Sequence, residues 1–276
     1  MRSLSRLLLI VSLAVGIGHA ASAQTGTSVD LELVLAVDVS LSMDMDEQRL
    51  QRDGYVAAFR DAEVWNAIAA GANGRIAVTY VEWAGQVNQQ TVLPWTLIDS
   101  PAAAQAFADQ LEAAPISRAR MTSISGAIIY SGRQLESNPY KGTRRVVDIS
   151  GDGPNNSGPP AQEARDELIN KGIIINGLPI LLKRDQPSGF FDINNLDSYY
   201  TNCVIGGAGA FMIPVRERAE FRSATRRKLI LEISDLVPEQ PARLIPAQAS
   251  AGASAEPIDC MIGERMWRLY MDGSRQ

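Results

Sequence analysis

Histidine and cysteine are scarce in this sequence of 276 residues. The single histidine, His19, lies in an N-terminal segment that we expect to be removed, and the two cysteines are Cys203 and Cys260. Without histidine in the remaining chain, Ser-His-Asp catalysis, Cys-His catalysis and histidine-ligated zinc are excluded. Two cysteines are also too few for a metal site built from thiolates. These classes of enzyme and metal site are therefore removed from consideration.

Long apolar runs are also lacking, apart from a short one near the N-terminus. Arg2 and Arg6 precede an apolar run at residues 7–17, and small residues at 21–23 form a cleavage site before Gln24. This three-part pattern predicts a secretory signal peptide over residues 1–23; the alternative is an uncleaved anchor, for which the run is short. No later segment of the sequence is long and apolar enough for a membrane span. We therefore expect a soluble mature chain that is periplasmic or secreted.

An excess of positive charge is lacking as well. The full sequence has 26 basic and 31 acidic residues and a net charge of −5. Removing Arg2 and Arg6 leaves 24 basic against 31 acidic residues, a net charge of −7. The basic cluster at residues 226–228 is interpreted as a solvated helix face. An acidic chain of this kind has no electrostatic footprint for nucleic acid, so nucleic acid is not an expected partner.

Predicted strands and helices alternate along most of the mature chain. Residues 31–37 are a nearly continuous apolar run, which is typical of a strand buried on both faces of a sheet. Residues 76–83 and 91–98 are joined by a short polar turn, which favours an antiparallel pair. We expect further strands at 145–150, from 173 and at 210–214, and helices at 46–60, 61–71, 100–114, 122–135, 161–171 and 221–236. This alternation predicts an α/β fold, a doubly wound three-layer sandwich with a mostly parallel central sheet.

The later part of the chain is less regular. Residues 183–200 are expected to form an irregular excursion, and residues 237–257, rich in proline and alanine, to form a flexible linker. Residues 258–276 contain apolar side chains and Cys260. An oxidising compartment favours a Cys203–Cys260 disulfide, which would tie this segment back to the domain. Free thiols or a bridge between two chains are the alternatives.

Oxygen-bearing side chains follow the first buried strand directly. Asp38, Ser40 and Ser42 form an Asp-x-Ser-x-Ser pattern there, and open parallel sheets bind ligands beyond the carboxyl ends of their strands. Thr122 lies where a loop enters a helix, and Asp152 lies just past a later strand. Carboxylate and hydroxyl oxygens suit Mg²⁺, Mn²⁺ or Ca²⁺ rather than zinc or copper. Each piece alone also fits an ordinary turn, so the prediction of a metal site depends on their combination.

The order of these pieces resembles the metal-ion-dependent adhesion site (MIDAS) of von Willebrand factor A-type (vWA) domains. The likeness consists of Asp-x-Ser-x-Ser after a strand, a distant threonine before a helix and an Asp-Gly after a later strand, over residues 30–235. The sequences at 150–156 and 199–209 are similar to a bacterial secreted branch of that family, a domain of unknown function (DUF1194). The resemblance implies a vWA-like domain over residues 24–236 and a binding module rather than an enzyme.

The resemblance also implies a role for each side chain at one divalent cation, with Mg²⁺ as the first choice and Mn²⁺ or Ca²⁺ as alternatives. Ser40 and Ser42 would bind the metal directly, and Thr122 would bind it directly or through water. Asp38 and Asp152 would supply charge, mostly through bridging waters. One coordination position would remain for an acidic side chain of a protein or peptide ligand, which gains a strong bond to a cation with few direct anionic ligands.

One position departs from the family pattern, and other classes of function stay open. Gly151 precedes Asp152 where the family often has Thr or Ser.

An EF-hand is excluded, because the twelfth position counted from Asp38 is Arg49 rather than Glu. A metal-dependent hydrolase using Asp38 and Asp152 is one alternative, although no histidine or basic phosphate clamp accompanies the site. A metal-free structural partner in an envelope assembly is the other. The function we expect is metal-dependent recognition of a protein or peptide outside the cytoplasm.

Overall fold

The computed structural model describes residues 26–182, 192–236, 238 and 258–273. The predicted signal peptide, all of the predicted linker except residue 238 and much of the irregular excursion at 183–200 lie outside the described residues. Within the described part, no helix is both long and apolar enough to cross a membrane.

A five-stranded sheet forms the centre of the fold, in the order β3-β2-β1-β4-β5. β1 pairs in parallel with both β2 and β4, and β4 pairs in parallel with β5. β2 and β3 are antiparallel, which confirms the hairpin predicted from their short separation. The strands are β1 (Thr27–Asp38), β2 (Ile76–Trp83), β3 (Gln89–Ile98), β4 (Tyr140–Gly151) and β5 (Ile174–Pro179).

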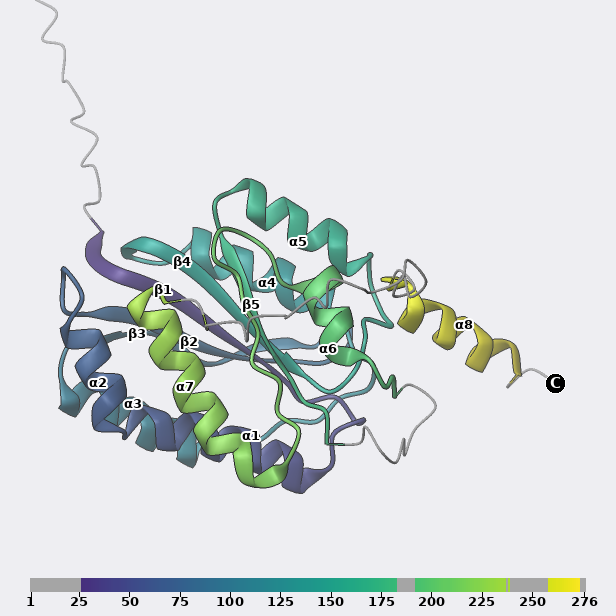
Figure 1. Cartoon of the computed structure of the whole chain (residues 1–276), viewed down its shortest axis with the longest axis horizontal. Helices are drawn as coiled ribbons and strands as arrows, with labels where there is room; N and C mark the ends of the chain where they lie inside the picture. The colour runs from purple at the N-terminus through teal and green to yellow at the C-terminus, as the bar shows by residue number, and fades with distance from the viewer. Residues whose placement is uncertain (1–25, 183–191, 237, 239–257, 274–276) are drawn as a thin grey trace, which may run out of the picture.

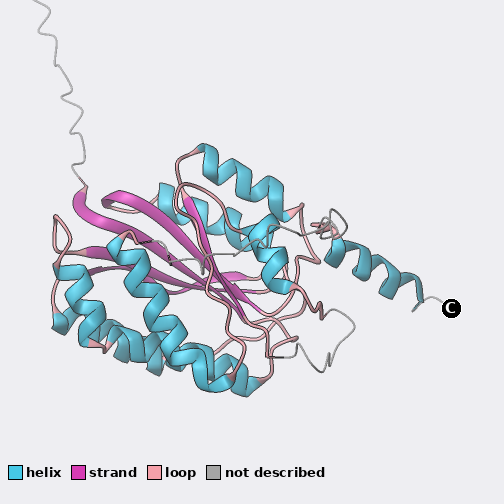
Figure 2. Cartoon of the chain, in the orientation of Figure 1, coloured by secondary structure: helices cyan, strands magenta, loops and turns pink. Residues whose placement is uncertain are grey.

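Helices cover both faces of the sheet, and the result is the predicted three-layer α/β sandwich (Figures 1 and 2). α1, α2, α3 and α7 lie on one face, and α4, α5 and α6 lie on the other. The helices are α1 (Met45–Phe59), α2 (Ala62–Ala69), α3 (Pro101–Ala113), α4 (Ile124–Glu136), α5 (Ala161–Asn170), α6 (Leu196–Tyr199), the π-helical η1 (Tyr200–Val204), the 3-10 turn η2 (Arg218–Glu220), α7 (Phe221–Ser234) and α8 (Ile262–Gly273).

The apolar run in β1 explains why two layers of helices are needed. Successive side chains of a strand point to opposite faces of the sheet. Leu33 and Leu35 belong to the core beneath α1, α3 and α7, whereas Val34 and Ala36 belong to the core beneath α4 and α5. All four side chains are fully buried. A polar residue at any of these positions would therefore place a polar group in the apolar core on one side of the sheet.

Short polar side chains set several helix starts. Ser100 caps α3, with its hydroxyl accepting from the Ala103 amide and Pro101 in the first turn. Asp61 caps α2 in the same way. Asp44 caps α1 in a reciprocal arrangement with Glu47, and that hydrogen bond helps to hold the pKa of the Asp44 carboxyl below its usual value. The position of α1 directly after the Asp-x-Ser-x-Ser segment is therefore encoded locally.

Three sequence expectations for the later part of the chain differ from the structure. The strand predicted at 210–214 is wrong: only isolated bridges form there, Met212 with Gly177 and Val215 with Ile180, and Pro214 has no amide to donate to a ladder. The sequence predicts no helix at residues 258–276, but this segment forms α8, which projects from one edge of the domain (Figure 1). The irregular excursion ends in α6 and η1 rather than in loop.

The topology brings two strand ends together where ligands bind in open sheets. From β1 the chain passes first to β2 on one side and later to β4 on the other, so β1 and β4 flank the switch point. In their register Val37 pairs with Ser150, which places Asp38 beside Gly151 at the carboxyl edge. The segment around Ala119 also joins this edge through a bridge to Ser40.

Candidate metal site

Asp38 is the first residue of the site and is fully buried at the end of β1. Its Oδ1 accepts a hydrogen bond of 2.7 Å from the Ser40 amide, which turns the chain out of the strand. Its Oδ2 has no hydrogen-bond partner among the described residues. A buried carboxylate oxygen without a donor is costly unless a cation is close to it.

A chain of hydroxyls joins the end of β1 to the end of β4. The hydroxyls of Ser40 and Ser42 lie 2.7 Å apart and share a hydrogen bond. The Ser42 hydroxyl in turn donates to Asp152 Oδ1 at 2.7 Å. Ser40 is buried and Ser42 is exposed, so the chain runs from the interior to the surface. Four of the five predicted site residues, Asp38, Ser40, Ser42 and Asp152, therefore lie together at this edge.

Thr122 is held at the same edge through its backbone. Its amide donates to Asn156 Oδ1 at 2.8 Å, and its carbonyl accepts from the Asn156 amide at 2.8 Å. Asn156 lies four residues after Asp152 in the loop that follows β4. Within the described chain, no hydrogen bond joins the Thr122 hydroxyl to the other four predicted residues. Thr122 thus lies beside the loop that carries Asp152, but its hydroxyl does not form a hydrogen bond with Ser40, Ser42 or Asp152 in the described part of the structure.

The electrostatics of the edge are those of a site that favours positive charge. Burial, and after it the negative charge of Asp152, raises the pKa of the Asp38 carboxyl well above its usual value. The Ser40 hydrogen bonds oppose this shift. A divalent cation would oppose the increase in the pKa of Asp38, because it stabilises nearby carboxylates in their charged form. A cation at this edge would therefore offset the repulsion between Asp38 and Asp152.

The donor set fits a hard cation with few anionic ligands. No group of three His, Cys, Asp or Glu side chains suited to a metal occurs in the part of the chain that the structure describes. Two carboxylates and the hydroxyls of serine and threonine are instead the available ligands, and hard oxygen donors suit Mg²⁺, Mn²⁺ or Ca²⁺. The orphaned oxygen of Asp38 supports the same assignment.

Sequence reasoning missed two residues that shape this edge. Tyr200, in η1, is fully buried and donates to the Gly151 carbonyl at 3.4 Å. Burial, followed by the charges of Asp38 and Asp152, raises the pKa of its hydroxyl well above the usual value, so the phenol stays neutral. Gln48, in α1, donates to the Ser40 carbonyl at 3.3 Å. Gln48 is a polar residue on the buried face of α1, and that position is the signal that could have found it. Tyr200 lies in the 199–209 segment that resembles the DUF1194 branch, but that resemblance gave it no role at the metal site.

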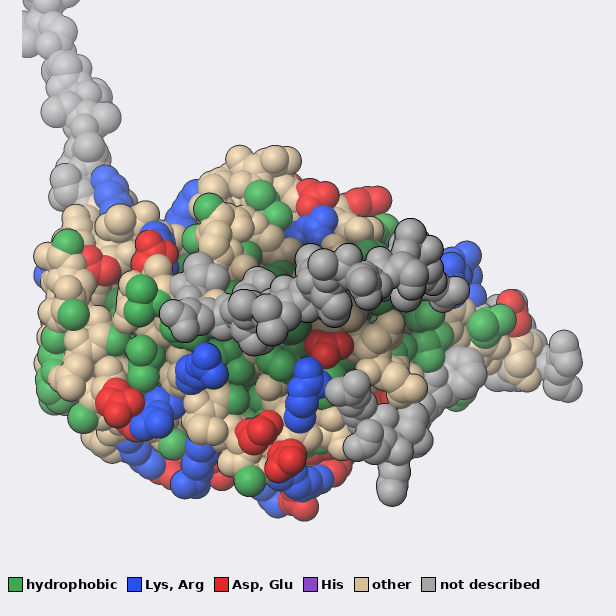
Figure 3. Space-filling view, viewed as in Figure 1, with side chains coloured by type: hydrophobic (Ala, Val, Ile, Leu, Met, Phe, Trp, Pro, Cys, Tyr) green, Lys and Arg blue, Asp and Glu red, His purple; other side chains and the backbone are tan. Residues whose placement is uncertain are grey.

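The surface of the helical layer formed by α1, α3 and α7 carries mixed charge. Lys and Arg alternate with Asp and Glu over α1, α3 and α7 on the face shown in Figure 3. Arg60 at the end of α1 pairs with Asp109 and Glu112 of α3, and Arg226 of α7 pairs with Asp61. These exposed pairs balance charge locally rather than building a field of one sign.

The sheet order, the helices on both faces and the carboxylate and hydroxyl edge define a vWA-like domain. The chain belongs to the family described as "Protein of unknown function (DUF1194)", which matches residues 28–237. Both the class and the branch that the motifs resembled are confirmed. A comparison with curated proteins finds no match in sequence.

Two solved proteins share the fold. The SpaC pilus adhesin from Lactobacillus rhamnosus GG, in its open conformation, aligns at 12% identity and a TM-score of 0.55, covering 75% of this chain and 30% of its own. Proximal thread matrix protein 1 (PTMP1) from the mussel byssus aligns at 13% identity and a TM-score of 0.52, covering 76% and 49%. A PTMP1 structure with a zinc-occupied MIDAS motif aligns at 14% identity and a TM-score of 0.50, covering 76% and 46%. This chain spans about half or less of each protein, and the likeness shows the fold alone.

Proposed function

We propose that the protein is an extracytoplasmic vWA-type binding module that recognises a protein or peptide ligand through a divalent cation. Asp38, Ser40, Ser42, Thr122 and Asp152 hold the cation. The observation that carries the proposal is the hydrogen-bonded chain from Ser40 through Ser42 to Asp152, beside the orphaned Oδ2 of Asp38. These oxygens converge where ligands bind in open α/β sheets.

The proposed ligands have different roles, which follow from their charge. The hydroxyls of Ser40 and Ser42 bind the ion directly, and Asp38 and Asp152 supply charge mostly through bridging waters. A cation with few direct anionic ligands remains electrophilic, so a carboxylate from the ligand completes its coordination. The proposed ligand group is therefore an Asp or Glu side chain. PTMP1 with its zinc-occupied MIDAS motif supports a divalent ion in this fold, and Mg²⁺ is the ion we propose here.

Two observations support the extracytoplasmic placement and the binding role. Cys203 and Cys260 form a disulfide, which is stable in the periplasm and outside the cell but uncommon in the cytosol. Together with the predicted cleavage near Ala23, this supports a periplasmic or secreted protein. SpaC is a pilus adhesin that shares the fold, which supports adhesion-type binding over catalysis.

The test is calorimetric titration of the purified protein with Mg²⁺, Mn²⁺, Ca²⁺ and Zn²⁺. We expect one-site binding that is lost in the Asp38→Ala and Asp152→Ala variants. Asp99→Asn is the matched control, because Asp99 is an exposed carboxylate that follows β3, at the opposite end of the sheet. Binding that survives in both site variants, or that is equally lost in the control, would contradict the assignment.

A further inference from the structure

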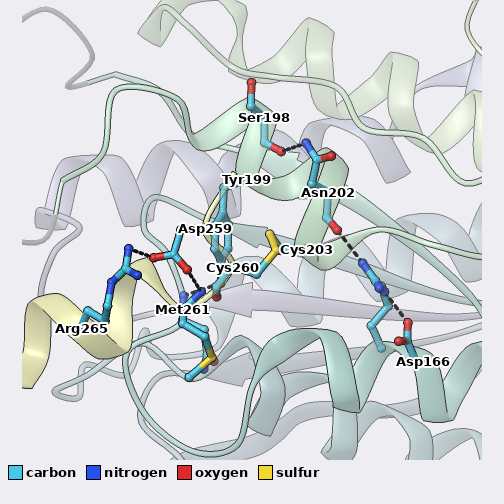
Figure 4. The surroundings of a disulfide bond; sticks show 11 residues. Asp166, Ser198, Tyr199, Asn202, Cys203, Asp259, Cys260, Met261 and Arg265 are labelled. Atoms are coloured by element: carbon cyan, nitrogen blue, oxygen red, sulfur yellow. Dashed lines mark hydrogen bonds and ion pairs between the residues drawn. A yellow bond between two sulfur atoms is a disulfide. The ribbon is translucent and has the colours of Figure 1, made fainter. Parts of the chain in front are cut away.

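Helix α8 is covalently attached to the main domain. Cys260 lies two residues before its first residue, Ile262, and is bonded to Cys203 of η1 (Figure 4). The Tyr199 hydroxyl donates to the Cys260 carbonyl at 3.5 Å, and Asp259 accepts from the Met261 amide at 3.0 Å and pairs with Arg265. The start of α8 is therefore fixed on the domain by the disulfide and by the hydrogen bond from Tyr199, and Asp259 stabilises the first turn of the helix.

The first turn of α8 packs directly on Asn155 in the loop after β4. Asn155 Nδ2 donates to Glu264 Oε1 at 2.7 Å. A side-chain carbon at Gly263 would lie 2.1 Å from the Asn155 carbonyl oxygen, so only glycine permits this approach of the two backbones. The Asn155 amide in turn donates to the Tyr199 hydroxyl at 3.2 Å. Helix, disulfide and loop thus meet at one fully buried asparagine.

Asn155 and its neighbour fix the position of the loop that carries Thr122. Asn155 Oδ1 accepts from the Ser125 amide at 3.0 Å, and Asn156 exchanges two hydrogen bonds of 2.8 Å with the Thr122 backbone. Because Asn155 is buried, loss of the Glu264 acceptor leaves one of its donors without that partner. A shift of Asn155 would then be passed to Ser125 and, through Asn156, to Thr122.

We propose that α8, anchored by the Cys203–Cys260 disulfide, is a clamp that positions Thr122 for the metal, with Glu264 and Gly263 as its contact points. The inference rests on the proposed function, since it names what controls the geometry of the same site. Partners of metal ligands that lie outside the coordination sphere set the orientation of those ligands and hence the affinity for the ion. Glu264 is a positioning residue and does not touch the cation.

Two variants disturb the contact in different ways, and each has a matched control. Glu264→Ala removes the acceptor, whereas Glu264→Gln keeps an oxygen that can accept from Asn155. Gly263→Ala pushes α8 away from Asn155, whereas Gly273→Ala adds the same carbon at a place with nothing within 4 Å. The double variant Cys203→Ser with Cys260→Ser releases the anchor.

The experiment measures the dissociation constant for Mn²⁺ by calorimetry, and the exchange of the Thr122 amide with solvent in EDTA. We expect Glu264→Ala, Gly263→Ala and the disulfide-free protein to bind Mn²⁺ about tenfold more weakly and to exchange the Thr122 amide faster. Glu264→Gln and Gly273→Ala should match the unaltered protein in both.

The two readouts separate this inference from the proposed function. If the unaltered protein binds Mn²⁺ and all variants bind it equally, with equal protection of the Thr122 amide, the proposal for α8 is overturned and the proposed function is not. If the unaltered protein binds no divalent ion, the proposed function is overturned, and so is the role of α8 in metal binding. The exchange rate of Thr122 then still decides whether α8 holds the loop.

Discussion

Gly151 lies against Asp38 so closely that a side-chain carbon at residue 151 would be 2.9 Å from Asp38 Oδ2. The same carbon would lie 3.2 Å from the Tyr200 hydroxyl. This contact gives a physical reason for the departure from Thr or Ser at this position of the vWA pattern. Tyr200 occupies the space beside residue 151, and glycine leaves room for the Asp38 carboxylate.

Gly151→Ala should therefore displace the Asp38 carboxylate and weaken divalent binding. We expect the dissociation constant for Mn²⁺ to rise by about tenfold, since the change acts on a group that orients the site. Overpacking should also lower the free energy of unfolding by about 1–3 kcal/mol. Calorimetry and urea unfolding measure the two effects. Gly153→Ala, where nothing lies within 4 Å, should change neither, and equal effects of the two substitutions would refute this explanation.

Stability should fall as the pH rises from 5 to 8, because of Glu232. Burial, and then the charge of Asp148, raises the pKa of Glu232 from 4.5 to about 7 despite its contact with Lys228. The folded state thus keeps a proton that the unfolded state loses above about pH 4.5. This contribution is complete below the unfolded pKa and is lost as the pH rises through the folded one.

Glu232→Gln isolates that contribution. Urea unfolding in EDTA at several pH values should show a shallower decline in the variant, by up to about 3 kcal/mol between pH 5 and 8. Asp38, whose pKa is also raised, affects both proteins alike, so the difference reports Glu232. Parallel pH profiles for the two proteins would mean that Glu232 is already charged in the folded state.

Removing the disulfide should lower the free energy of unfolding. Cys203 and Cys260 are separated by 57 residues, and closing a loop of that length in the unfolded chain corresponds to about 4 kcal/mol in the chain-entropy treatment. Guanidinium unfolding of the Cys203→Ser, Cys260→Ser protein measures this change. The unaltered protein unfolded with dithiothreitol should agree with the variant. A loss below about 1 kcal/mol would show that the bridge adds little global stability.

No phosphoester or ester hydrolysis is expected from the site. Metal-assisted hydrolysis needs a positioned nucleophile and a group that activates it, and the sequence after residue 19 has no histidine to act as a general base. Incubation with Mg²⁺ and p-nitrophenyl phosphate or acetate tests this directly. Turnover above background that disappears in Asp152→Ala would instead favour the hydrolase alternative.

The sequence predicted those parts of the fold that depend on local patterns. The apolar run of β1, the Ser100 cap of α3 and the hairpin of β2 and β3 each follow from neighbouring residues. The strand expected at 210–214 failed because a ladder also needs a partner with matching groups, and Pro214 cannot donate to one. Helix α8 was missed although Ile262, Met266 and Leu269 recur at helical spacing.

The candidate site was predictable only in part for the same reason. The sequence located Asp38, Ser40 and Ser42 together, because they follow one strand. Their approach to Asp152 depended on β1 and β4 being neighbours, which the vWA resemblance supplied and the sheet order shows. The clamp through Glu264 and Asn155 joins residues 109 positions apart, and no local pattern reports such a contact.

The most direct test of the metal site is anomalous diffraction from crystals grown with Mn²⁺. We predict one strong peak at the carboxyl ends of β1 and β4, about 2.0–2.3 Å from the hydroxyl oxygens of Ser40 and Ser42, which is the range for small hard cations. Crystals of Asp38→Ala grown in the same way should lack the peak. A peak elsewhere, or no peak at this edge in the unaltered protein, would contradict the account.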